Sequence, residues 1–158
     1  MKTLATLLLL LPLATACASG PGKSELDAEV KRLCAIDGGI RVYERVSLPE
    51  EKFVGYKSGN INIPTYEKVT PQDIFYYKKS IQYIRQDGIP DSGGADLLRH
   101  HYELYQVKDN KLLGDAISYA RRGGDIPGPW HQSSFSCPQP KELNLFERVF
   151  FIQKGDKK

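Results

Sequence analysis

The first regular pattern in the mature part of the chain is helical. Between residues 24 and 38 the apolar side chains recur every three to four positions, which places them on one face of a helix. Ser24 and Asp27 form a variant of the capping box at the start of this segment, and the glycine pair after Asp37 ends it. The sequence therefore predicts a helix whose buried face directs Cys34 into the core. That face comprises Leu26, Val30, Leu33 and Cys34.

After this helix the pattern changes to an alternation of apolar and polar residues, which is typical of β-strands. Asp109 and Asn110 separate two of these segments and can adopt positive φ, so we expect a tight two-residue hairpin. A helix is the alternative for residues 97–105. The predicted strands are Ile40–Val46, a short one at Ile61–Ile63, Ile74–Gln86, Leu97–Lys108, Lys111–Arg122 and Leu143–Gln153. These elements predict an α+β fold, with an N-terminal helix packed on an antiparallel sheet of four to five strands.

The start of the chain carries a different pattern. Lys2 is followed by an almost wholly apolar run over residues 4–13 and then by Ala14-Thr15-Ala16-Cys17. A basic start, an apolar stretch too short to span a bilayer and small residues at the end describe a secretory signal. The last four residues resemble the lipobox of bacterial lipoproteins, which implies that the Cys17 thiol is acylated and that the chain is cut before it. An ordinary secretory signal cut beside Cys17 is the alternative.

This interpretation divides the chain into a signal peptide (1–16), a lipidated cysteine with a flexible tether (17–23) and a single globular domain (24–158). Ala18 follows the cysteine, and the resemblance to enterobacterial lipoproteins without Asp at that place implies transport to the outer membrane. We therefore expect a domain anchored there by lipid and facing the periplasm. The formal net charge of +3 is too small to indicate a nucleic-acid partner.

The cysteine count fits export from the cytoplasm. Lipidation uses Cys17 and leaves Cys34 and Cys137 as an even pair in an oxidising compartment, so we expect these two to form a disulfide. Two buried thiols are the alternative. A zinc site is less well supported, because neither cysteine has a CxxC partner or a nearby histidine.

Residues 121–138 are the most unusual segment after the tether, since they are rich in Gly and Pro and contain the only Trp. Such a segment loses little conformational freedom on ordering, and the expected disulfide at Cys137 would hold it against the helix. It is therefore a candidate recognition loop, and packing over the open end of the core is the alternative explanation of its aromatic residues. The candidate residues are Arg121, Arg122, Asp125, Trp130, His131 and Phe135.

Catalytic patterns are weak in this chain. His100 and His101 are adjacent on a predicted strand, where they face opposite sides and cannot bind one metal together. His101 and Glu103 would share a strand face, and His131 could approach Asp125 in the loop, but such pairs are usually structural. We find no HExxH, GxSxG or phosphate-binding motif, and we predict neither a metal nor a cofactor.

The lipobox and the Gly/Pro-rich segment together resemble those of small proteobacterial outer-membrane lipoproteins that carry no assigned activity. The anchor, the tether and the Gly/Pro-rich loop held by the expected disulfide favour a non-catalytic binding or accessory module of the cell envelope with a protein or peptidoglycan partner. An inhibitor of a lysozyme-like wall-degrading enzyme is the second hypothesis. The third is a cell-wall hydrolase that uses His131 or the pair of His101 and Glu103.

Overall fold

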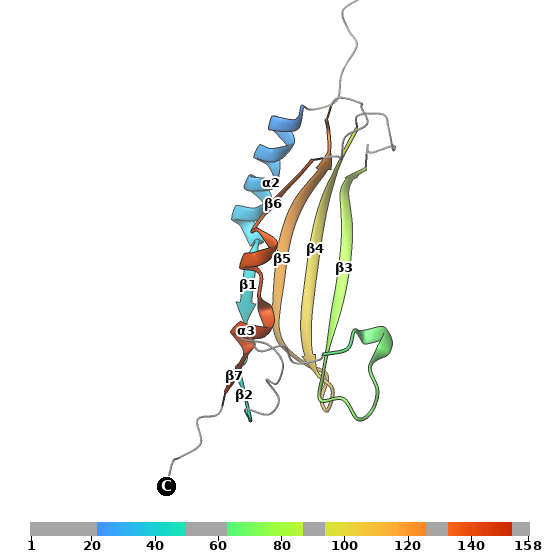
Figure 1. The fold of residues 1–158 in the computed structure, drawn as a ribbon, viewed down its shortest axis with the longest axis vertical. Helices are drawn as coiled ribbons and strands as arrows, with labels where there is room; N and C mark the ends of the chain where they lie inside the picture. The colour runs from blue at the N-terminus through green and yellow to red at the C-terminus, as the bar shows by residue number, and fades with distance from the viewer. Residues whose placement is uncertain (1–21, 50–62, 87–93, 126–132, 153–158) are drawn as a thin grey trace, which may run out of the picture.

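The computed structural model describes residues 22–49, 63–86, 94–125 and 133–152 of the chain. Within these residues, helix α2 precedes a five-stranded antiparallel sheet of order β1-β5-β4-β3, with β6 also paired to β5 (Figure 1). The predicted α+β fold is confirmed. The elements are α2 (Lys23–Asp37), β1 (Gly39–Val42), β2 (Val46–Leu48), η3 (Tyr66–Lys68), β3 (Phe75–Gln86), β4 (Ala95–Gln106), β5 (Lys111–Gly123), β6 (Ser134–Cys137), η4 (Pro140–Glu142), α3 (Leu145–Val149) and β7 (Phe150–Ile152).

Strands β3, β4 and β5 form the long curved part of the sheet in Figure 1. They coincide with three predicted strands to within two residues at each end, because alternation over a dozen residues is a strong signal. The alternative helix at residues 97–105 is wrong, since these residues pair with β3 on one side and β5 on the other. The short strand predicted at Ile61–Ile63 falls largely outside the described residues, and Ile63 itself is not in a strand.

The turn between β4 and β5 differs from the predicted one. Gln106 pairs with Lys111, so the loop has the four residues 107–110 and not two. Asn110 has a φ of 55°, the positive value expected from the sequence. The Asp109 carboxylate accepts a hydrogen bond from the Lys111 amide at 3.2 Å, and this bond closes the wider turn.

Strands β1 and β6 lie end to end along one edge of β5. β1 pairs with residues 114–117 and β6 with residues 119–122. The predicted disulfide is present at this junction, where Cys34 near the end of α2 and Cys137 at the end of β6 have Cα atoms 5.8 Å apart. Residues 134–137 were expected to lie in a loop. They form a strand instead, because the edge of β5 offers them backbone partners.

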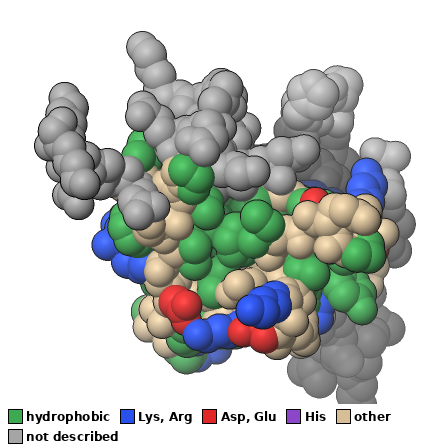
Figure 2. Space-filling view, turned by 90° about the horizontal axis from the view of Figure 1, so that it is seen from below, with side chains coloured by type: hydrophobic (Ala, Val, Ile, Leu, Met, Phe, Trp, Pro, Cys, Tyr) green, Lys and Arg blue, Asp and Glu red, His purple; other side chains and the backbone are tan. Residues whose placement is uncertain are grey.

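The two faces of the sheet are covered by different helices. Neighbouring residues of a strand point to opposite faces, so Ile117 packs toward α2 and Ala116 packs toward α3. We call these the α2 face and the α3 face. The α2 face buries Val30, Cys34, Leu97, Ile117 and Tyr119. The α3 face buries a larger cluster that includes Leu104, Leu113, Ala116, Leu145, Val149 and Phe150. Figure 2 views the end of the molecule where Figure 1 places β2 and β7, and hydrophobic side chains gather in the middle of it.

The C-terminal prediction is wrong in part, because residues 145–149 form helix α3 and only 150–152 form a strand. The Asn144 side chain accepts a hydrogen bond from the Glu147 amide at 3.4 Å and caps the helix. Leu145 and Val149, four residues apart, then both turn toward the sheet. A strand would point them the same way, so the local pattern does not separate the two structures.

Two further boundaries differ from the predictions. Ser24 does not cap α2: it lies inside the helix, whose N-cap is Gly22 and has no side-chain cap. The strand predicted at Ile40–Val46 is two short strands, because β1 ends at Val42 and β2 starts at Val46 to pair in parallel with β7. The chain thus leaves one sheet and enters another within a few residues.

Gly114 allows α3 to pack directly on the backbone of β5. A Cβ atom there would lie 2.8 Å from the Arg41 carbonyl oxygen and 3.1–3.2 Å from Val149 and Leu145. We expect Gly114→Ala to lower the free energy of unfolding by about 1–3 kcal/mol, as overpacking of a core does. Urea unfolding measures this loss, with Gly22→Ala as control because nothing lies within 4 Å of a Cβ at that position. Equal stabilities of the two variants would contradict the packing described here.

Candidate functional site

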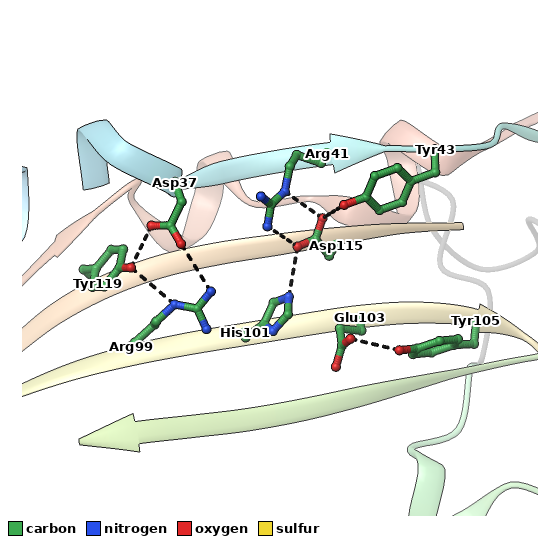
Figure 3. Close-up of polar contacts among 9 residues, drawn as sticks. All are labelled: Asp37, Arg41, Tyr43, Arg99, His101, Glu103, Tyr105, Asp115 and Tyr119. Atoms are coloured by element: carbon green, nitrogen blue, oxygen red, sulfur yellow. Dashed lines mark hydrogen bonds and ion pairs between the residues drawn. The ribbon is translucent and has the colours of Figure 1, made fainter. Parts of the chain in front are cut away.

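A group of charged and aromatic side chains occupies the α2 face of the sheet beyond the end of the helix (Figure 3). Its centre is Asp115 on β5, whose side chain is 2% exposed. Arg41 on β1 donates to both carboxylate oxygens, with its Nε 3.0 Å from Oδ1, and the Tyr43 hydroxyl donates to Oδ1 at 3.1 Å. His101 on β4 brings its Nε2 to 2.9 Å from Oδ2. One carboxylate therefore joins side chains from β1, from β4 and from the residue after β1.

A second carboxylate, Asp37 in the last turn of α2, lies beside this group. It accepts a hydrogen bond from the Tyr119 hydroxyl at 2.7 Å and from Arg99 at 3.3 Å, and Arg99 also donates to Tyr119 at 3.2 Å. The strand alternation explains why these residues meet. Arg99 and His101 on β4, like Asp115 and Tyr119 on β5, lie an even number of residues apart and share one face.

The partners of both aspartates determine how they ionise. Burial alone would raise the pKa of Asp115, but the hydrogen bonds from Arg41, His101 and Tyr43 outweigh it, and the pKa lies below its ordinary value. Burial likewise opposes the lowering of the Asp37 pKa that Tyr119 and Arg99 cause, and the hydrogen bonds again prevail. Both carboxylates are therefore ionised at neutral pH, and the charge of each is balanced by an arginine.

These shifts predict how stability depends on acid. A carboxyl group with a lowered native pKa binds fewer protons than in the unfolded chain, where its pKa is about 3.9. The stabilisation is complete above that pKa and is lost as the pH falls through the native pKa. We expect urea unfolding between about pH 6 and pH 2 to show this loss, and Asp115→Asn to make the dependence shallower. The control is Asp109→Asn in the hairpin loop. If the stability of Asp115→Asn depended on pH as steeply as that of the control, the prediction would be contradicted.

The pair of His101 and Glu103 was one of the catalytic candidates. Both residues lie on β4 and point to the α2 face, but the structure gives each a different partner (Figure 3). His101 contacts Asp115, while Glu103 accepts a hydrogen bond from the Tyr105 hydroxyl at 2.9 Å. Burial and this bond to Glu103 raise the pKa of Tyr105 to about 12. His101 thus joins β4 to β5 through Asp115, whereas Glu103 and Tyr105 are bonded within β4.

The structure separates the residues of the candidate recognition loop. Arg121 is 1% exposed and donates to Asp27 on α2, to the carbonyl oxygen of Gly123 and to Ser133. The expectation that its side chain is presented at the surface is therefore wrong. Its place on β5 points it to the α2 face, where the helix covers it. Arg122, on the opposite face, is exposed and pairs with Asp96 at 2.9 Å.

Asp125 also forms contacts within the domain. It pairs with Lys23 at 2.8 Å and accepts hydrogen bonds from the amide and hydroxyl groups of Ser133, which together lower its pKa to about 2. Phe135 is partly buried against the α2-face cluster, with the Lys31 ammonium 5.5 Å from its ring centre. Trp130, His131 and Cys17 lie outside the described residues, so their predicted roles remain predictions.

A pocket of about 580 Å³ lies on the α3 face, between the sheet and the segment that runs from β6 to α3. Its floor is formed by residues of β3, β4 and β5, among them Tyr77, Tyr102 and Ser118. Phe146 on α3 closes one side and meets the Tyr77 ring edge to face, with centroids 5.9 Å apart. The volume falls within the range of about 300–1,000 Å³ that is usual for small-molecule sites.

The two adjacent histidines of β4 belong to different sites. It faces the pocket, whereas His101 faces Asp115, as the alternation predicted. Burial, with the positive charges of Lys79 and Arg122, lowers the pKa of His100, so its imidazole is neutral at pH 7. A neutral imidazole offers one hydrogen-bond donor and one acceptor to a ligand.

Sequence reasoning did not find this pocket, although a signal was present. Alternate positions of β5, Gly114, Ala116, Ser118 and Ala120, carry small side chains on the α3 face. Large residues at these positions would fill the space. The segment from β6 to α3 that forms the other wall is predicted as loop and strand, and nothing in its local pattern places it over these residues.

Comparison of the chain with models of protein families, with curated proteins and with solved structures finds no match. In the described part of the chain, no three His, Cys, Asp or Glu side chains are grouped so as to hold a metal ion. None of the helices in the same part combines the length and the apolar character that crossing a bilayer requires. Among the described residues, the α+β fold and the pocket on its α3 face define the candidate ligand site.

Proposed function

We propose that this protein is a lipid-anchored protein of the bacterial cell envelope whose α+β domain is a non-catalytic binding module. The pocket on the α3 face carries the proposal. It combines aromatic walls with a few polar groups, His100, Ser118 and Asn144 among them, which is the usual composition of a binding site. The charged groups of the α2 face, by contrast, are bonded to one another and hold the strands together.

The anchor is supported by the resemblance of residues 14–17 to a lipobox. We expect Cys17→Ser to abolish acylation and to release the protein from the membrane fraction, because the acyl group is its proposed attachment to the membrane. Metabolic labelling with a palmitate analogue checks this, with Ser80→Ala, at an exposed position of β3, as a control that retains the lipobox and the disulfide. Equal labelling of the wild type and Cys17→Ser would contradict the anchor.

The binding role is tested in the intact envelope. A photo-crosslinking amino acid replaces Tyr102 or Phe146 in the pocket, or Tyr66, which is exposed at η3 outside it. We expect a discrete crosslinked product from the two pocket positions and none from the control position. Mass spectrometry then identifies the product as an envelope protein, a fragment of peptidoglycan or a lipid. Products that are the same at all three positions would overturn the assignment of the pocket.

The two other hypotheses make different predictions in the same experiments. An inhibitor would crosslink to a lysozyme-like enzyme and reduce its turnover. A hydrolase would release fragments from purified peptidoglycan and would lose this activity in His101→Ala or His131→Ala. Release of peptidoglycan fragments by the purified protein would contradict the proposed binding module and would favour an enzyme.

A further inference from the structure

The pocket on the α3 face has walls suited to an apolar ligand. Tyr77 and Phe146 form one side through their edge-to-face contact, and Leu143 and Leu145 lie on the segment that covers it. On the floor, Ala116 and Ala120 present methyl groups. A sugar has hydroxyl groups around its ring and needs a polar partner for most of them. A hydrocarbon chain needs none, and these walls match it better.

Among the described residues, the lining of the pocket carries positive charge and no negative charge. Lys141, on η4, is the charged side chain among the described lining residues, since His100 is neutral. Lys79 lies at the rim, with its ammonium 5.5 Å from the centre of the Tyr102 ring. No Asp or Glu of the described residues lines the pocket. Glu142, the neighbour of Lys141 in sequence, accepts a hydrogen bond from the Gln139 amide at 2.9 Å and is used in the turn.

We propose that this pocket binds an amphipathic anion, with a hydrocarbon chain against the aromatic and aliphatic walls and an acidic head group at Lys141. This inference rests on the proposed function in one respect, because both assign a ligand to the same pocket. It adds the chemical class of the ligand. A free fatty acid and an anionic lysolipid share this chemistry, and the test distinguishes between them.

The test uses the full chain with Cys17→Ser, so that no acyl group of its own competes. Dodecanoate and lauroyl lysophosphatidylglycerol are titrated below their micelle concentrations, and dodecanol below its solubility limit, while NMR follows the backbone amides of Ser118, Ala120 and Ser134. We expect the anions to shift these signals and to bind about tenfold more tightly than dodecanol, because a hydrogen bond to a charged group contributes about 1.5 kcal/mol or more. Preference for dodecanoate or for the lysolipid identifies the source of the chain.

Two pairs of variants separate the charge from the walls. Lys141→Gln should weaken dodecanoate binding about tenfold and leave dodecanol binding unchanged, while Lys108→Gln in the hairpin loop changes neither. Ala120→Leu should fill the pocket and reduce binding of all three ligands, and Ala35→Leu on the exposed side of α2 should not. The amide spectrum of each variant without ligand shows that it is folded.

Equal affinity for dodecanoate and dodecanol, or an unchanged affinity in Lys141→Gln, would overturn the anionic ligand. Crosslinks from Tyr102 and Phe146 without any binding of the amphiphiles would overturn this inference and leave the binding module in place. Amphiphile binding without discrete crosslinks in the envelope would support the proposed class of ligand and would contradict the proposed role as a binding module of the envelope.

Discussion

Replacing Cys34 and Cys137 together by Ser is expected to lower the free energy of unfolding by about 4–5 kcal/mol. The disulfide closes a loop with a sequence separation of 103 residues, and in the chain-entropy model a loop of that length restricts the unfolded chain strongly. Its position adds to the effect, since it joins α2 to β6 beside the junction with β1. Domains of this size have a total stability of about 5–15 kcal/mol, so the double variant is expected to be partly unfolded at 37 °C.

Urea unfolding of the oxidised protein, the reduced protein and the double variant measures this contribution. Reduction and substitution should have the same effect, because both remove one bond and retain residues of similar size. The matched control is Ser80→Ala on β3, which is exposed and far from the junction in sequence. A double variant within about 1 kcal/mol of the wild type would show that packing of α2 alone holds this edge of the sheet.

The second large effect is expected at Arg121. Arg121→Ala should cost about 3 kcal/mol or more, because Arg121 is buried and its partner Asp27 is only partly exposed. The substitution leaves Asp27 without its arginine and removes the donor that the carbonyl oxygens of Gly123 and Ser133 share. It also leaves a cavity at the largest fully buried side chain of the described residues.

Thermal and urea unfolding check this value against Arg32→Ala. Arg32 forms an exposed pair with Glu29 on the surface of α2, and its loss should change the stability far less, because solvent screens an exposed pair. Similar small losses of stability in both variants, together with weaker partner binding by Arg121→Ala, would contradict this structural role. They would support the role in recognition that was predicted from the sequence.

The parts of the fold that could be predicted are those where one pattern runs over many residues. The apolar positions of α2 and the alternation in β3, β4 and β5 were each long enough to separate a helix from a strand. The disulfide followed from the count of cysteines and the expected compartment, not from geometry.

The short elements could not be predicted, because their structure depends on partners far away in the sequence. β2 exists as a strand because Val46 meets Phe150, more than a hundred residues later. β6 needs the edge of β5, and α3 needs the space that Gly114 leaves. A segment of three to five residues carries too little local preference to decide such cases.

The same limit applies to the site. Arg121 and Arg122 look alike in the sequence, yet one is buried under α2 and the other is exposed, because successive residues of β5 face opposite sides. The pocket depends on the small residues of β5 and on the later segment that covers them. Only the first of these can be read from the sequence.

The direction of the long strands sets how far this protein would reach from a membrane. Helix α2 starts at the end of the sheet opposite the β4–β5 hairpin, and the lower end in Figure 1 carries that hairpin together with β2 and β7. A strand of 13 residues spans about 40 Å. If Cys17 carries the proposed acyl group, the α2 end of the described residues is the one nearer the anchor in sequence, and the hairpin tip can reach up to about 40 Å beyond that end, with the pocket between the two ends.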